Sequence, residues 1–263
     1  WFSKGKTMLN FDPARFLRIQ SGTVTIARDL GALVGRLVAE GADSLFFMGS
    51  GGAGILMQPA TDLMRRASNL PCHNVLCAEI VLTGHVALGP KSVVIMPSLS
   101  GTTKESIAAM DYVKARGATV ISITGHADTP LAKGADHAFV NFAEDDTSCE
   151  MFYVTSLVAA LAAMQARGER SDYDRIIAEL AGLPQQLLAV KQAFEPRADA
   201  LARAIAADGW HIITGSGAAW PQAYYYGMCI LEEMQWIRTR PVHASDFFHG
   251  TLELVEKGVS VVV

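Results

Sequence analysis

Hydroxyl side chains gather in one short segment of the chain, residues 96–104, with the sequence MPSLSGTTK. The segment follows an apolar run, Ser92–Met96, and leads into a stretch with helical periodicity, Thr102–Arg116. A phosphate group binds well at such a place, because the first turn of a helix has unpaired N–H groups and a partial positive charge. A glycine in the loop lets the backbone approach the ligand closely. The candidate phosphate-binding residues are Ser98, Ser100, Gly101 and Thr103.

A structural explanation competes with this one, since Thr102 and Glu105 have the spacing of a capping box. A capping box would use only one of the hydroxyls, so the others would still need a role.

A glycine-rich turn follows another apolar run, Ser44–Met48, and we expect Gly49, Ser50 and Gly51 to contact the substrate. The turn has no P-loop lysine, although with Gly54 it matches the bare pattern GxGxxG. A dinucleotide site therefore remains an alternative. It would require an acidic residue at the end of the next strand, and Glu79 comes somewhat late for that role.

Two adjacent carboxylates, Glu232 and Glu233, lie in a stretch that is apolar almost all round, Pro221–Trp236. Such a helix is expected to be buried, and burial raises the pKa of a carboxyl group toward the range useful for general acid–base chemistry. Periodicity does not distinguish the two glutamates. A structural ion pair with Arg238 or Arg240 is the alternative.

The elements that would position these residues alternate between strands and helices, which predicts an α/β fold with doubly wound parallel sheets. The expected strands are short and almost continuously apolar, as is usual when helices cover both faces of a sheet. In the first half they are Ser44–Met48, Asn74–Cys77, Ser92–Met96, Thr119–Thr124 and His137–Val140. The expected helices there are Gly54–Ala67, Thr102–Arg116 and the short Pro130–Gly134. A long helical region, 149–194, follows, with breaks near Gly168 and at Pro184.

An internal repeat divides the chain into two halves. An amphipathic helix, a glycine stop, an apolar strand and a Gly-Ser-Gly turn occur first at 29–51 and again at 198–217. The second half then has the helix Pro221–Trp236, a short strand around Val242 and a strand at Val259–Val263. We therefore expect two halves related by internal duplication, 22–170 and 171–263. The chain stops on what looks like the start of a strand, which suggests a missing C-terminal segment, and Met8 is a candidate natural start.

Net charge, hydropathy and cysteine spacing limit the classes of function that this chain could have. The net charge of -4 gives no basic footprint for a nucleic acid, and no apolar run reaches the ~20 residues that span a bilayer. We expect neither nucleic-acid nor membrane binding. The four cysteines have no zinc-binding spacing and are expected to be reduced, as in a cytoplasmic protein, so we expect no metal. We also expect no cofactor.

The loop Ser98-Leu-Ser-Gly-Thr-Thr103 resembles the phosphate loop of the sugar isomerase (SIS) domain family, Ser-x-Ser-Gly-x-Thr after the third strand. The duplicated halves resemble the two-SIS isomerase part of glucosamine-6-phosphate synthase. In such enzymes a catalytic glutamate precedes the histidine of a His-Gly motif by sixteen residues, the separation between Glu233 and His249 here. The phrase Ala244-Ser-Asp-Phe-Phe-His-Gly250 is most similar to the fructosamine-6-phosphate deglycases.

The resemblance implies that Glu233 moves a proton between C1 and C2 of a sugar phosphate and that His249 assists ring opening. His243 is expected to support the site. Two departures from the synthase, Ile230 and Leu99 at positions where it has lysine and glutamine, favour the deglycase over its isomerase chemistry. The resemblance also implies a homodimer with sites between subunits.

Other functions stay open at this stage. A phosphosugar aldose–ketose isomerase would use the same scaffold without breaking a C–N bond. A sugar-phosphate sensor would bind without catalysis, although no helix-turn-helix precedes the first half and a sensor would not need a buried glutamate paired with a histidine.

Overall fold

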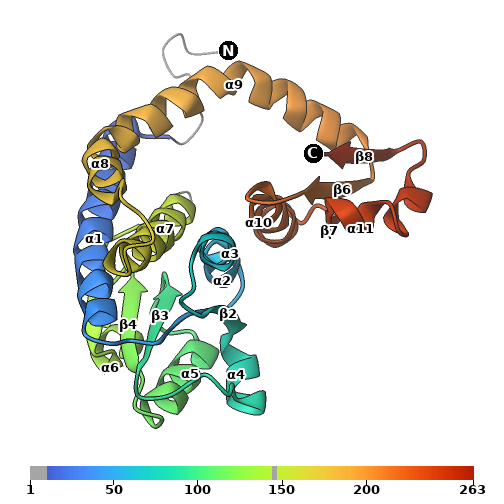
Figure 1. Cartoon of the computed structure of the whole chain (residues 1–263). Coiled ribbons are helices and arrows are strands. Elements are labelled where there is room, and N and C mark those ends of the chain that lie inside the picture. Colours follow the sequence, from blue (N-terminus) through green and yellow to red (C-terminus); the bar gives the residue numbers. More distant parts are fainter. Residues whose placement is uncertain (1–10, 144–146) are drawn as a thin grey trace. The chain divides into compact units, whose positions relative to one another are not determined.

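The computed structural model describes residues 11–143 and 147–263 of the chain (Figure 1). The chain divides into two compact units, one formed by residues 19–181 and the other by residues 11–18 together with 182–263.

A five-stranded parallel sheet forms the centre of the first unit, with the strand order β2-β1-β3-β4-β5. Every residue of β1 and β3 is buried, because helices cover both faces of the sheet. The five strands predicted from apolar runs are therefore confirmed to within about two residues. They are β1 (Ser44–Gly49), β2 (Cys72–Leu76), β3 (Ser92–Ser98), β4 (Thr119–Thr124) and β5 (His137–Val140).

The helices of the first unit fill the connections between these strands. They are α1 (Pro13–Ala39), α2 (Gly52–Ile55), α3 (Gln58–Ala67), α4 (Cys77–Thr83), α5 (Lys104–Lys114), α6 (Pro130–Gly134), α7 (Ser148–Ala166) and α8 (Tyr173–Glu179), of which α1 belongs to this unit from Ile19 on. Figure 1 shows α4 and α5 on one side of the sheet and α3 and α7 on the other. Phe46, Val94 and Val120 point from the sheet into the core beneath α4 and α5, where Ile80 and Met110 meet them.

One sequence prediction for this unit was wrong, and one helix was missed. The single helix expected at Gly54–Ala67 is two helices, because the backbone of Gly54 packs against Gly49 and the chain turns again before Gln58. Helix α4 was not predicted, since its outer face carries the exposed apolar residues Val81 and Leu82 in place of a polar stripe.

Helix α7 is long and apolar enough to cross a bilayer, and it is the one helix of that kind in the described ranges. The helix packs inside the unit, with 61% of its apolar window buried, and Val158 and Ala162 lie against Gly31 of α1. We therefore assign α7 as a core helix.

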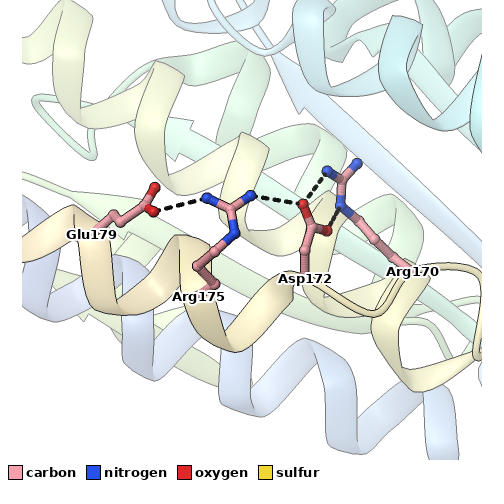
Figure 2. Close-up of polar contacts among 4 residues, drawn as sticks. All are labelled: Arg170, Asp172, Arg175 and Glu179. Carbon is pink, nitrogen blue, oxygen red and sulfur yellow. Dashed lines mark hydrogen bonds and ion pairs between the residues drawn. The ribbon is translucent and has the colours of Figure 1, made fainter.

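An ion-pair network connects the loop after α7 to α8 (Figure 2). Asp172 accepts from Arg170 at 2.5 Å and from Arg175 at 3.1 Å, and Arg175 reaches Glu179 at 2.8 Å. The breaks predicted near Gly168 and Pro184 are confirmed, since α7 ends at Ala166 and the next long helix starts at Leu183.

The second unit contains a three-stranded parallel sheet in the order β7-β6-β8. Its strands are β6 (Trp210–Gly215), β7 (Thr239–His243) and β8 (Val259–Val262), close to the predicted positions. Its helices are α9 (Leu183–Ala207), α10 (Ala219–Tyr225), a π-helix η2 (Tyr226–Met234) and α11 (Ala244–Phe247), with short 3₁₀ turns at η1 (Leu180–Gly182), which precedes α9, and at η3 (Thr251–Leu254).

Candidate active site

The strand order of the first unit places two predicted loops next to each other. The chain passes from β1 to β2 on one side and later to β3 on the other, so the sheet has its topological switch point at the carboxyl ends of β1 and β3. Ligands of open α/β sheets bind in the crevice at such a point. The Gly49–Gly51 turn follows β1 and the Ser98–Thr103 loop follows β3, so both lie at this edge.

The hydroxyls of the phosphate loop, Ser98–Thr103, are arranged by local hydrogen bonds. Ser98 is 4% exposed, and its Oγ accepts from the N–H of Gly101 at 3.1 Å and lies 3.2 Å from Thr103 Oγ1. Ser100 is exposed, and its Oγ accepts from the N–H of Thr102 at 3.3 Å and from the hydroxyl of Thr102 at 3.1 Å. Gly101 has φ +64°, a conformation that favours glycine.

Helix α5 begins without a side-chain cap, so the competing explanation, a capping box formed by Thr102 and Glu105, is wrong. The N-cap residue is Thr103, whose carbonyl accepts from the N–H of Ile107 at 3.1 Å but whose hydroxyl makes no capping bond. Because no side chain caps this end, the first N–H groups of α5 remain available to an anion.

The glycine-rich turn after β1 depends on close backbone contact. A β-carbon on Gly49 would lie 2.6 Å from the backbone of Gly54, so only glycine fits there. Gly51 has φ 55° and ψ −137°, and its carbonyl accepts from Ile55 at 3.1 Å. Ser50 is partly exposed between the two glycines.

Two side chains that sequence reasoning missed connect this turn to the phosphate loop. Cys77, the first residue of α4, is fully buried and forms hydrogen bonds with Ser106 of α5 and with Ser50. Burial raises the pKa of the Cys77 thiol, so the thiol is neutral at pH 7. The available signal was the position of Ser106, three residues beyond Thr103 and hence on the same face of the helix.

The structure distinguishes the two adjacent glutamates of the second unit. Glu232 is partly buried, and its Oε1 accepts from Thr239 Oγ1 at 2.6 Å. Glu233 is exposed, so the expectation that it is buried is wrong, because the last turn of the π-helix does not lie under another element in this unit. No ion pair joins either glutamate to Arg238 or Arg240 within the described ranges.

The helix that carries these glutamates ends two residues earlier than predicted. Trp236 follows it with φ 57° and is 89% exposed, which makes it a strained residue in solvent. A shallow hollow of about 360 Å³ is lined by Glu232, Trp236, Ile237, Arg238 and Thr239. Glu233 is not among these residues, so the hollow does not mark the predicted catalytic carboxylate.

The histidines of the Ala244–Gly250 segment have different environments. His249 is exposed in the turn after α11, and its N–H donates to the carbonyl of Asp246 at 2.9 Å. His243 caps α11, since its Nδ1 accepts from the N–H of Ser245 at 3.2 Å and lies 2.7 Å from Ser245 Oγ. In the described residues, no side-chain hydrogen bond joins His249 to Glu233.

The described residues can be compared with the needs of a metal ion and of a dinucleotide. Among residues 11–143 and 147–263, no group of three His, Cys, Asp or Glu side chains could hold a metal ion. The four cysteines are free thiols. Glu79 lies on an exposed position in the first turn of α4, so it is not at the strand end that a ribose contact would require.

Comparison with known proteins finds a family match within the first unit. Residues 40–169 match the SIS domain family. The match contains β1 to β5 together with the phosphate loop and the Gly49–Gly51 turn. It accounts for one SIS domain, so it does not show the predicted duplication.

Relatives with described activities cover most of this chain. Fructosamine deglycase FrlB of Bacillus subtilis is 28% identical over 250 residues, which are 93% of this chain and 75% of that protein. Fructoselysine 6-phosphate deglycase of Escherichia coli is 26% identical over 230 residues, 87% of this chain and 66% of that protein. A crystal structure described as a phosphosugar isomerase from Bacillus subtilis has 26% identity and a TM-score of 0.80, over 91% of this chain and 74% of that one. These likenesses support an enzyme of the deglycase or isomerase kind.

Proposed function

We propose that this chain, whose residues 40–169 match the SIS domain family, is a deglycase that splits a 6-phosphofructosyl amine into glucose 6-phosphate and an amine or amino acid. The relatives named above as deglycases, at 28% and 26% identity, support this choice of substrate class.

One observation carries the proposal. The N-terminus of α5 has no side-chain cap, and it lies beside the hydroxyls of the phosphate loop at the switch point of the sheet. Ser98, Ser100, Gly101 and Thr103 would bind the phosphate there, since N–H groups and hydroxyls are donors to its oxygens. Gly49, Ser50 and Gly51, on the neighbouring strand, would contact the sugar.

The proposed reaction consists of a proton shift and a hydrolysis. The substrate has a ketone at C2 and an amine at C1. Removal of a proton from C1 and delivery of a proton to C2, together with transfer of the amine N–H proton to the C2 oxygen, convert this pair into a hydroxyl at C2 and an imine at C1. Water then adds to the imine carbon, the C–N bond breaks, and the nitrogen leaves as the protonated amine. No step needs a metal or an external oxidant.

Glu233 is the proposed base for the proton shift, and His249 is proposed to assist opening of the sugar ring. Glu233 has a free carboxylate in the described structure, whereas Glu232 is held by Thr239, and this difference favours Glu233 for contact with a substrate. A positioned acid–base group contributes about 10²- to 10⁴-fold to a rate.

A phosphosugar aldose–ketose isomerase is the second candidate, favoured by the similarity to the Bacillus subtilis structure with that description. An isomerase would perform the same proton shift between C1 and C2 and would leave no C–N bond to hydrolyse.

A coupled assay for glucose 6-phosphate tests the proposal with a panel of 6-phosphofructosyl amino acids. We expect release by the wild type and a loss of at least 10²-fold in kcat for E233Q and for H249A. E232Q is the matched control, because it changes the neighbouring carboxylate, which is engaged by Thr239, and we expect its activity to stay within a few-fold of wild type.

The other outcomes separate the alternatives. Interconversion of aldose and ketose phosphates without release of an amine would assign the protein to the isomerases. Binding of sugar phosphates without turnover of any compound would favour a sensor. Equal losses in E232Q and E233Q would contradict the assignment of Glu233 as the base.

We also propose that the second unit belongs to a second, duplicated SIS domain, with boundaries near 22–170 and 171–263. The strand order β7-β6-β8 parallels β2-β1-β3, and Gly217 after β6 has φ 54° where Gly51 after β1 has 55°. Gly215 also packs closely on Ala219, as Gly49 does on Gly54. A homodimer is proposed as well, and light scattering of the purified protein tests it.

A further inference from the structure

The phosphate loop is held from one side by the segment between β4 and α6. The carbonyl of Leu99 accepts from the N–H of Gly125 at 2.9 Å, and the carbonyl of Gly101 accepts from the N–H of Leu131 at 3.1 Å. In a trans peptide the N–H points away from the carbonyl of the same peptide unit. The N–H of Ser100 therefore points away from this segment, whereas the N–H of Thr102 donates to Ser100 Oγ at 3.3 Å and so orients that hydroxyl.

Thr129 lies directly against the apex of the loop. A β-carbon on Gly101 would be 2.6 Å from Thr129 Cβ and still closer to Thr129 Oγ1, so the threonine occupies the space of a side chain at position 101. Thr129 is only 5% exposed, and the glycine it touches has φ +64°. The conformation of the loop thus depends on this contact.

The hydroxyl of Thr129 is fixed by two hydrogen bonds, one as donor and one as acceptor. It donates to the carbonyl of His126 at 3.2 Å and accepts from the N–H of Ala132 at 3.3 Å, where it caps α6. Because the hydroxyl has both partners, the side chain presents a rigid surface to Gly101 and does not turn away from it.

We propose that Thr129 is a positioning residue that sets the affinity for phosphate by holding the Gly101 turn in its binding conformation. This inference rests on the proposed sugar-phosphate function. Thr129 does not touch the ligand itself. Its effect is to keep the N–H of Ser100 and the start of α5 aligned before the ligand arrives, which lowers the ordering cost of binding.

Thr124 offers a matched control. It is fully buried at the end of β4, and its hydroxyl donates to the same carbonyl of His126 at 3.0 Å. No atom of Thr124 is among the nearest neighbours of a β-carbon at position 101. T124V and T129V therefore both remove a buried hydroxyl bonded to His126, but only T129V changes the support of the loop.

The test measures binding of inorganic phosphate and of glucose 6-phosphate by calorimetry, together with the thermal midpoint and with kcat and KM. T129V removes the hydrogen bonds of the hydroxyl with His126 and Ala132, and we expect it to raise Kd and KM about fivefold, with kcat at saturation within twofold of wild type. T129S keeps the hydroxyl and should bind within twofold of wild type. T124V should lower the thermal midpoint and leave Kd within twofold.

Several results would overturn the inference. T129V could lower the midpoint without changing Kd, or T124V could weaken phosphate binding as much as T129V does, and either outcome would reduce Thr129 to a structural role. If T129V does not fold, T129A replaces it, with the same expected rise in Kd. If the wild type binds neither phosphate nor glucose 6-phosphate, the proposed function and this inference both fail, whereas wild-type binding that no Thr129 variant alters refutes the inference alone.

Discussion

Replacement of Gly101 by alanine should damage both the stability of the first unit and its phosphate site. Gly101 has φ +64°, and a left-handed conformation costs an L-residue about 1–2 kcal/mol. The added methyl would also lie 2.6 Å from Thr129 Cβ, so Thr129 or the loop must move. Overpacking of this kind costs about 1–3 kcal/mol more. G101A should thus lower the free energy of unfolding by about 2–5 kcal/mol.

Gly168 allows the two contributions to be separated. Its φ of +68° is close to that of Gly101, but a β-carbon there would meet no atom within 4 Å. G168A should therefore cost only the conformational part, about 1–2 kcal/mol. The difference between the two variants measures the contact with Thr129.

Urea unfolding, followed by circular dichroism, measures the stability of both variants, and calorimetry with inorganic phosphate measures the site. We expect G101A to unfold at a lower urea concentration than G168A and to lose most of its phosphate affinity. G168A should bind phosphate as the wild type does. Equal midpoints for the two variants, or normal phosphate binding by G101A, would refute the argument that Gly101 is required by close contact at the phosphate loop.

Burial and the nearby charge of His85 lower the pKa of His73, so stability should be complete above the unfolded value of about 6.5 and should fall as the pH drops through that value toward the lower folded pKa. Thermal midpoints of wild type and H73Q between pH 5 and 8 check this, and an identical pH dependence in the two would contradict it. Burial raises the pKa of Cys72 to about 12 and also raises that of Cys77, so neither thiol should react with iodoacetamide at pH 8 until urea unfolds the first unit. Peptide mass mapping measures the labelling, and rapid modification of either cysteine in the folded protein would contradict the raised pKa of its thiol.

Much of the first unit could be predicted from local sequence. The strands β1, β3 and β4 are runs of apolar residues that have only one stable place, inside a sheet covered on both faces. The location of the phosphate loop followed as well, because a hydroxyl-rich stretch between a buried strand and a helix must lie at the carboxyl edge.

Other features depended on contacts that a single segment does not encode. Helix α4 has only seven residues and an apolar outer face, so no helical periodicity revealed it. The carboxylate of Glu233 was expected in a buried helix because its neighbours are apolar, yet burial is a property of what packs over a residue, and in this unit nothing covers the end of η2.

The amino-acid sequence by itself determined the α/β architecture, the positions of the apolar strands along the chain and the residues of the phosphate loop. These features follow from residue types and from their spacing along the chain. Only the tertiary structure decided which distant residues support that loop. Cys77 joins Ser50 to Ser106, and Thr129 rests on Gly101, because folding brings the ends of β1, β2, β3 and β4 to one edge of the sheet. Such contacts depend on side-chain shape and on distances across the sheet, and neither can be read from the spacing of residues along the chain.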